Sequence, residues 1–361
     1  MSEGWRDRGT VEVLFPVERD VTRWQHRHRA GEVPGLWPYG LDALRDVTSL
    51  HVRAAGVRSP RRVERVLARV LPARPWLRRP GRDVGLAWDE NAAQRMVTIR
   101  AHREMYAGAI WITDAAAAAG AGTTDRRIAA VGRTLRRMAG VFVLSRAQVE
   151  PLVEFLGPAG PPVGWVRFGV DTAFYPYAPY PERPLVVSVG GDRDRDAATL
   201  YAALARVHDQ VPDAEIVVQT TSELTPPDGV TVARYFTHRQ LRELYGRASV
   251  VAIATKPNLH ASGMTVSLEA MSTGRPVVIT GTAGLEDYVA EGVGGHLVPV
   301  GDAPSLADRV VDLLRDPGRA EALGRAARAR VEQSLSTRTL VEDLADLMKL
   351  PARETSPGLA G

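Results

Sequence analysis

The stretch 260–271 places a glycine and two hydroxyl side chains where they could hold an anion. It follows an apolar run, 250–254, that is typical of a buried strand, and it leads into a helical pattern. Ser262 and Gly263 therefore fall at a helix N-terminus, where free backbone N–H groups and the helix dipole favour a phosphate. Glycine lets the backbone approach that phosphate, and the hydroxyls of Ser262 and Thr265 could donate to it.

Glu269 lies one turn further into the same helix and could accept hydrogen bonds from a pair of sugar hydroxyls. The alternative is a serine N-cap followed by a surface glutamate, and this stretch by itself favours that interpretation. The neighbouring segments change the balance.

The segment 187–196 ends another apolar run and carries Gly190 and Gly191 followed by two arginines. Arg193 and Arg195 come just past a strand's carboxyl end, so they would point into a cleft and could neutralise a leaving diphosphate. Three aspartates alternate with them, which could suggest a metal site. Because the arginines supply cations and no matching ligand set is apparent, we expect local Asp–Arg pairing and no metal.

Short apolar runs and helical patterns alternate along the whole chain. Strands are expected in the first half at 11–15, 49–53, 84–88, 109–112 and 141–144, with helical patterns such as 60–71 and 126–138 between them. In the second half they are expected at 185–189, 215–219, 231–233, 250–254, 276–280 and 296–299, with helices at 197–207, 239–248, 265–273 and 305–315. This alternation predicts two α/β domains with doubly wound parallel sheets, whose ligands bind beyond the carboxyl ends of the strands.

Composition and prolines suggest where the domains divide. We expect a first domain at 1–175, a proline-rich linker at 176–184, a second domain at 185–335, a helix at 336–350 that could cross back to the first domain, and a disordered tail at 351–361.

The 361 residues exceed one ordinary core, which agrees with two domains. With no cysteine, a disulfide framework, a thiolate zinc site and a cysteine nucleophile are excluded. No apolar stretch is long enough to span a membrane, and residues 1–10 lack an apolar signal core, so we expect a soluble, cytoplasmic protein.

Positive charge is concentrated in the first half. Residues 1–178 carry 27 basic and 18 acidic residues, a net +9, whereas 179–361 carry 19 and 24, a net −5. Nine arginines fall within 58–82, which could hold an anionic acceptor or make peripheral contact with a membrane. A solvated arginine-rich helix is the alternative. No pattern of aromatic residues for base stacking is interleaved with these arginines, so no nucleic-acid partner is expected.

Five segments of the second half together resemble the donor-binding domain of GT-B glycosyltransferases, most closely those of family 4. The resemblance covers about 165–345, and the segments are 168–174, 190–199, 262–278, 284–289 and 294–299. It implies a GT-B fold with two Rossmann-like domains facing a central cleft. It also implies transfer, with retention, of a sugar from a nucleotide-diphosphate donor, UDP or dTDP with GDP open, to a hydroxyl of a small-molecule, glycan or lipid acceptor, without a cofactor or an essential metal.

The resemblance assigns roles residue by residue. Arg193 and Arg195 would stabilise the diphosphate as it leaves, and the carboxylate of Glu269 would bind the nucleotide ribose. The expected donor-binding residues are Gly190, Gly191, His260, Ser262, Gly263, Met264, Thr265 and Glu269. The family's other glutamate position is occupied by Ala261, so a carboxylate near the donor sugar is missing and His260 could substitute for it.

The first domain departs further, because its first strand leads to Glu18 and Arg19 where the family has a glycine-rich loop. Asp89, Glu90 and Asp114 follow strands at the cleft side, so they are candidates for orienting or deprotonating an acceptor hydroxyl. Capping of the following helix is an equal alternative for each. With Glu90, Arg19 is a candidate for binding the acceptor. His26 and His28 belong to a basic loop that we do not expect to bind metal.

Three other functions stay open. Another GT-B chemistry, such as a nucleotide-sugar epimerase or a phosphorylase, would convert the donor without an acceptor. A non-catalytic subunit that binds a nucleotide sugar would explain Ala261 and the missing glycine loop. A nicotinamide dehydrogenase is disfavoured, because no Gly-x-Gly-x-x-Gly follows 11–15 or 185–189. Nothing in the sequence indicates the oligomeric state.

Overall fold

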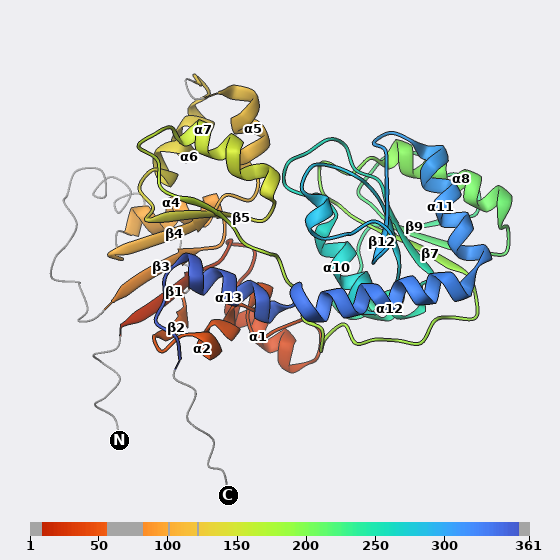
Figure 1. Ribbon diagram of the computed structural model, residues 1–361, viewed down its shortest axis with the longest axis horizontal. Helices are drawn as coiled ribbons and strands as arrows, with labels where there is room; N and C mark the ends of the chain where they lie inside the picture. The colour runs from red at the N-terminus through yellow and green to blue at the C-terminus, as the bar shows by residue number, and fades with distance from the viewer. Residues whose placement is uncertain (1–8, 56–81, 100–101, 121–122, 354–361) are drawn as a thin grey trace, which may run out of the picture.

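Two six-stranded parallel sheets lie side by side in the computed structural model, which describes residues 9–55, 82–99, 102–120 and 123–353 (Figure 1). The first sheet has the order β2-β1-β3-β4-β5-β6, with β1 Thr10–Leu14, β2 His51–Ala54, β3 Asp83–Ala87, β4 Glu104–Gly108, β5 Gly140–Val143 and β6 Val163–Trp165. The second has the order β12-β11-β10-β7-β8-β9, with β7 Leu185–Val189, β8 Glu215–Gln219, β9 Val230–Ala233, β10 Val250–Ile253, β11 Val277–Thr280 and β12 Gly295–Val298. The paired strands of both sheets are parallel, which confirms the α/β fold class expected from the sequence.

Helices cover both faces of each sheet, and this is why the central strands are buried on both sides. One face of the first sheet packs against α4 Glu90–Ile99, α5 Ile112–Ala119, α6 Arg126–Leu135 and α7 Val149–Leu156. The other face shares a core with η1 Pro38–Ala43, α2 Leu44–Val47 and α13 Thr337–Leu347, with α1 Val21–Arg29 at its edge. In the second domain α8 Ala197–Gln210 and α11 Ala303–Arg315 cover one face, and α9 His238–Arg247, α10 Met264–Ser272 and α12 Pro317–Ser334 cover the other.

The chain passes between the two sheets twice, and the two passages are hydrogen-bonded to each other. Val170 donates to the Leu335 carbonyl and accepts from Thr337, each at 3.0 Å. Gly169 lies so close to the Ser336 carbonyl that a Cβ at this position would overlap it. Beyond this crossing α13 packs against α2 and η1 of the first domain, and Figure 1 shows α12 and α13 running in sequence from one sheet to the other. This pairing fixes how the two domains face each other.

Several expectations from the sequence differ from the structure. The strand expected at 109–112 is wrong: β4 lies at Glu104–Gly108 and α5 already begins at Ile112. The tail is ordered in its first three residues, because the Thr48 hydroxyl donates to the Pro351 carbonyl at 2.8 Å and Ala352 bridges to Thr48. Strand β6 and helix α12 were not expected.

The helix at 60–71, the arginines of 58–79 and the tail from 354 lie outside the described residues. Arg82, the last arginine of that group, is described and pairs with Glu104 at 2.7 Å. Within the described residues no helix is long and apolar enough to cross a membrane.

Candidate active site

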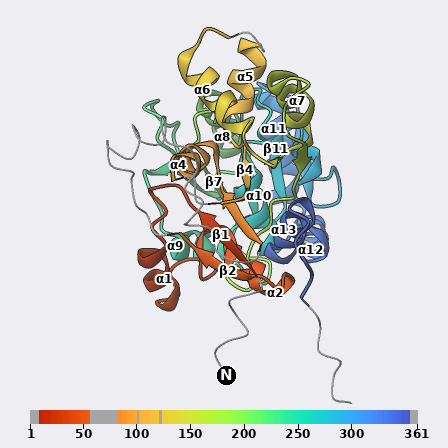
Figure 2. The ribbon, with the colours of Figure 1, turned by 90° about the vertical axis from the view of Figure 1, so that its left-hand side faces the viewer.

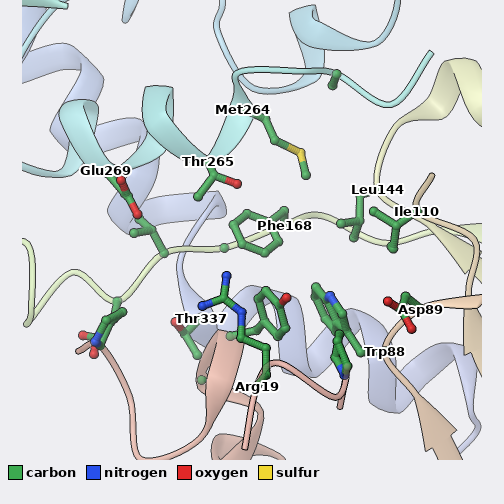
Figure 3. A pocket seen from close by; sticks show the side chains of 18 of the residues that line it. Arg19, Trp88, Asp89, Ile110, Leu144, Phe168, Met264, Thr265, Glu269 and Thr337 are labelled. Carbon is green, nitrogen blue, oxygen red and sulfur yellow. The ribbon is translucent and has the colours of Figure 1, made fainter. Parts of the chain in front are cut away.

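A cavity of about 330 Å³ lies where the carboxyl ends of the two sheets face each other. Its first-domain wall is largely aromatic: Tyr39 is stacked on Trp88 with ring centroids 4.0 Å apart, and Phe168 packs edge-on against both. Figure 3 shows Trp88 on one side, with Met264 and Thr265 projecting from α10 on the other. The volume falls within the range of small-molecule sites.

Helix α1 of the first domain and helix α9 of the second lie beside each other (Figure 2). Arg239 on α9 donates to the Ala30 carbonyl at 2.6 Å, and the Trp24 ring lies edge-on to His238 at 5.6 Å. Burial, aided by two arginines, lowers the pKa of His238 to about 4, so this imidazole is neutral at physiological pH. Among the described residues, α1 and α9 therefore meet through a hydrogen bond and a ring contact and form no ion pair with each other.

The N-terminus of α10 points at the cavity, as the sequence predicts for residues 262–265. Gly263 adopts a left-handed φ of 98° and lets the chain turn into the helix, where a side chain would meet Ile279 at 2.7 Å. Met264 and Thr265 open the first turn, whose N–H groups have no partner within the helix. Four residues that the sequence predicts for a donor site, Ser262 to Thr265, thus line the cavity together.

Arg195 is the second element of an anion site. The residue is partly buried, and its buried Nε and Nη1 atoms have no hydrogen-bond partner among the described residues. It lies against Gly190, where a Cβ would overlap Nε, and a Cβ on Gly263 would come within 3.0 Å of Nη1. Burial lowers the pKa of Arg195, but a guanidinium keeps its proton in proteins, so a fixed positive charge sits beside the α10 N-terminus.

A second, polar cavity of about 320 Å³ adjoins Arg195 on its other side. Gly190, Gly191, Arg193 and Lys256 line it, so it collects the cationic side chains at the ends of β7 and β10. Arg193 itself is exposed: it pairs with Asp194 at 3.1 Å and donates to the Trp111 carbonyl of the first domain at 3.2 Å. Of the two predicted diphosphate arginines, only Arg195 is held inside the protein.

His260 connects the two domains. Its Nδ1 lies 2.9 Å from the Asp114 carboxylate, and its Nε2 lies 3.5 Å from both Asp192 and Asp194. Burial alone would lower its pKa, but the hydrogen bonds with Asp114 and Asp192 outweigh that and raise it to about 9. The same contacts outweigh burial at Asp114 and Asp192 and lower the pKa of each. At neutral pH His260 is an imidazolium between carboxylates.

The three side chains Asp192, Asp194 and His260 also have the spacing of metal ligands, with their ligand atoms within 4.8 Å of one another. A protonated imidazole is not a metal ligand, so the raised pKa of His260 works against a metal here. The third aspartate of the segment, Asp196, instead caps α8 by accepting from Thr199 at 3.1 Å. The expectation that no metal is essential stays a prediction.

Glu269 is enclosed, and both of its oxygens accept from tyrosine hydroxyls: Tyr175 at 2.9 Å and Tyr245 at 3.0 Å. Burial raises its pKa to about 7, although these hydrogen bonds lower it. Glu269 lines the cavity, so its carboxylate can still reach a ligand hydroxyl by exchanging a tyrosine partner. Its predicted role with ribose stays a prediction.

Two predicted hydroxyl and acceptor roles differ from the structure. The Ser262 hydroxyl donates to Asp192 at 2.8 Å, so it orients that carboxylate and does not face a phosphate. Glu90 does not line the cavity; its oxygens accept from the backbone of Ile110 at 3.1 Å and Trp111 at 3.2 Å. Burial raises the pKa of Glu90 to about 7. Glu90 holds the loop after β4 in place.

The remaining first-domain candidates divide between the cavity and the domain contact. Asp89 lines the cavity and also caps α4, accepting from Ala92 at 2.7 Å, while burial raises its pKa. Asp114 lies outside the cavity lining and accepts from Leu259 at 2.7 Å in addition to His260. Arg19 lines the cavity. Arg19 and Asp89 therefore lie at the cavity, whereas Asp114 lies at the contact between the two domains.

Sequence reasoning missed the residues that shape the site by packing. Tyr39 has a left-handed φ of 61°, which is rare for a bulky residue, and Tyr175 and Tyr245 enclose Glu269. The sequence signal for the turn at Tyr39 is indirect: it is the glycine at position 40, which follows Tyr39 and also adopts a positive φ.

Comparison with known families agrees with this geometry. Residues 183–316 match the family model of Glycosyl transferases group 1. The second domain is a group 1 glycosyltransferase domain. The match includes the α10 N-terminus, Arg195 and Glu269, and it leaves the first domain outside.

Curated relatives match over part of the chain. Alpha-maltose-1-phosphate synthase of Mycobacterium tuberculosis is 27% identical over 218 residues, which is 51% of this chain and 56% of that protein. Glycogen synthase of the same species is 26% identical over 242 residues, 61% and 56% of the two chains. D-inositol 3-phosphate glycosyltransferase of Kribbella flavida is 39% identical over 87 residues, 24% and 20%. The chain thus spans about half the length of the two mycobacterial relatives.

Solved structures match over nearly the whole chain. Sucrose-phosphate synthase from Thermosynechococcus elongatus superposes with a TM-score of 0.65 at 19% identity and covers 94% of this chain and 98% of its own. The complex of Anabaena HepE with UDP-glucose also gives 0.65, at 16% identity, with coverage of 94% and 99%. At such identities the likeness shows the fold alone, and that fold is GT-B.

Proposed function

We propose that the chain is a glycosyltransferase that moves a sugar from a nucleotide-diphosphate donor to an acceptor hydroxyl, with retention of the anomeric configuration. The group 1 domain supports the activity, and the complexes of HepE with UDP and UDP-glucose support a UDP-sugar as the donor. The acceptor is a small molecule, a glycan or a lipid.

One observation carries the proposal: next to a helix N-terminus, two buried guanidinium nitrogens of Arg195 have no hydrogen-bond partner among the described residues. Leaving Nε and Nη1 of Arg195 unpaired is costly, and a diphosphate between Arg195 and α10 would satisfy both. Such preorganised charges stabilise the diphosphate more as it leaves than in the bound donor, and each is worth on the order of 3 kcal/mol in a transition state. In a retaining reaction the acceptor hydroxyl attacks from the same face, assisted by the departing phosphate oxygen.

Binding of the nucleotide is the first test. Thermal unfolding is measured with UDP, dTDP, GDP and ADP, and with uridine as the matched ligand that lacks the diphosphate. A ligand at about 100 times its Kd stabilises the folded protein by about 2.7 kcal/mol, which moves the midpoint by several degrees. We expect a shift with one nucleoside diphosphate and none with uridine. Equal shifts with UDP and uridine, or no shift with any diphosphate, would contradict the proposal.

A non-catalytic subunit that binds a nucleotide sugar is the second candidate, favoured by Ala261 at the family's glutamate position. Ala261 is fully buried with a left-handed φ of 51°, so no carboxylate projects from this point toward the donor sugar. Under this alternative the nucleotide binds, but the donor is neither transferred nor slowly hydrolysed.

A further inference from the structure

Arg19 lies in the loop between β1 and α1 and is the one arginine or lysine that lines the interdomain cavity within the described part of the chain. Its guanidinium packs over the rings of Trp24 and Tyr39, 5.4 Å and 5.8 Å from their centroids. No described carboxylate forms an ion pair with it. Figure 3 shows the guanidinium pointing away from its loop and into the cavity.

The support under Arg19 is rigid. The Trp24 indole donates to the carbonyls of Pro34 and Gly35, each at 3.3 Å, and Tyr39 is stacked on the buried Trp88. Tyr39 holds a strained left-handed backbone conformation, a feature that clusters at functional sites. The direction of the guanidinium is therefore fixed before any ligand arrives, which lowers the entropy lost on binding.

The acids on the cavity wall already have other partners. Asp89 accepts from Ala92, and Asp171 accepts from Gly35 at 3.0 Å. Glu269, whose carboxylate oxygens bind two tyrosine hydroxyls, stays partly protonated near neutral pH because burial raises its pKa to about 7.

Two further side chains beside Arg19 do not compensate its charge. Glu18, the preceding residue, is exposed to solvent. His238, across the cleft, is neutral at physiological pH, because burial lowers its pKa to about 4. The cavity thus presents a guanidinium that forms no ion pair with a described wall residue, although its charge acts on Glu269 and lowers the pKa of that carboxyl.

The opposite wall favours the same kind of ligand. Met264 and Thr265 begin α10 there, and the first-turn N–H groups of a nine-residue helix attract negative charge. An anion in the cavity would meet the α10 N-terminus from the second domain and the Arg19 guanidinium from the first. The guanidinium and the helix dipole would thus attract the same anion, each from a different domain.

We propose that Arg19 binds a phosphoryl group of a substrate in the cleft, opposite the N-terminus of α10. This inference rests on the proposed function. The phosphoryl group belongs to the donor diphosphate or to a phosphate on the acceptor, since both present the same oxygens to a guanidinium. In either case Arg19 is the first-domain contribution to a site that the group 1 domain does not contain.

The test compares the wild type with Arg19→Gln, Arg19→Lys and the control Arg23→Gln. Arg23 is an exposed arginine on α1 that does not line the cavity, so its loss removes the same charge from the same region. Calorimetry measures the Kd of UDP in one arm. The other arm titrates inorganic phosphate into protein saturated with UDP, and into protein without nucleotide. Circular dichroism and the unfolding midpoint show that each variant is folded.

We expect Arg19→Gln to weaken one of the two ligands by about tenfold or more, with Arg19→Lys recovering part of the loss and Arg23→Gln unchanged. Weaker UDP assigns Arg19 to the donor, and weaker phosphate with intact UDP binding assigns it to the acceptor. Unchanged UDP and phosphate affinities in folded Arg19→Gln would overturn the inference. If the wild type binds no UDP, the proposed donor fails, and the titration without nucleotide still decides the role of Arg19.

Discussion

Replacing Arg195 by methionine separates a ligand-binding arginine from a structural one, because the two roles predict opposite changes in stability. Two donor nitrogens of Arg195, Nε and Nη1, are buried and have no hydrogen-bond partner among the described residues. Each unsatisfied buried donor costs about 1–3 kcal/mol, whereas methionine fills a similar volume with no polar atom. After the packing lost to imperfect fit, we expect Arg195→Met to raise the free energy of unfolding of the free protein by about 1–3 kcal/mol.

The same substitution should weaken the nucleotide. Charge-assisted hydrogen bonds contribute about 1.5–3 kcal/mol, so the Kd of UDP should rise by about 10- to 150-fold. Thermal unfolding without ligand and calorimetric titration with UDP measure the two effects on the same preparations. Arg206→Met is the matched control, because Arg206 lies exposed on α8 outside both cavities, and it should change neither quantity much.

A stabilised variant that no longer binds UDP is the signature of a site preorganised for an anion at the expense of stability. If Arg195→Met is instead destabilised and binds UDP as the wild type does, the guanidinium supports the fold and the reasoning on the diphosphate is refuted.

Three further predictions concern other parts of the site. The ion pairs of His260 raise its pKa to about 9 despite burial. They therefore add up to about 3 kcal/mol to the free energy of unfolding, fully present below pH 6.5 and lost as the pH rises through 9. Denaturant titrations of His260→Gln should show the loss of this contribution at low pH and no loss above pH 9. Gly263→Ala should destabilise the protein and abolish UDP binding, whereas Gly292→Ala, with a similar φ of 72° and no neighbour within 4 Å, should cost only the backbone strain, of about 1–2 kcal/mol, and keep UDP affinity. Because burial raises the pKa of Glu269 to about 7, the wild type should lose stability relative to Glu269→Gln as pH rises from 4.5 through 7; parallel pH profiles of the unfolding midpoint would contradict this.

The second domain could be predicted closely because its strands are short, apolar and flanked by clear helical patterns. β7 and β8 have the bounds that the pattern indicates. In the first domain the apolar run 109–112 was wrongly predicted to be a strand, because Ala109 and Ile110 are buried although they lie in the loop after β4. The strand β4 itself begins with Glu104 and Met105, which are only half-buried and so give a weaker apolar signal. Helix α12 is rich in arginine and alanine and carries no pronounced apolar stripe, so periodicity does not reveal it.

The site could be predicted where one segment supplies it and not where distant segments meet. Gly263 and Thr265 lie two residues apart in the chain, so the local sequence pattern is enough to place both at a helix N-terminus. The Asp114–His260 pair joins residues 146 positions apart, and no spacing rule contains it. Glu90 was expected at the acceptor because it follows strand β3. Its carboxylate instead accepts hydrogen bonds from the backbone of Ile110 and Trp111, which follow the neighbouring strand β4. Side-chain partners across the fold decide such cases.

Conversion of the donor tests the central claim most directly. The protein is incubated with UDP-glucose, and with the corresponding dTDP and GDP sugars, and phosphorus NMR follows the diphosphate diester. The account predicts slow release of one nucleoside diphosphate without acceptor, faster release with an acceptor hydroxyl, and loss of both in Arg195→Gln. A donor that binds yet stays intact under all these conditions would contradict catalysis and leave a nucleotide-sugar-binding subunit.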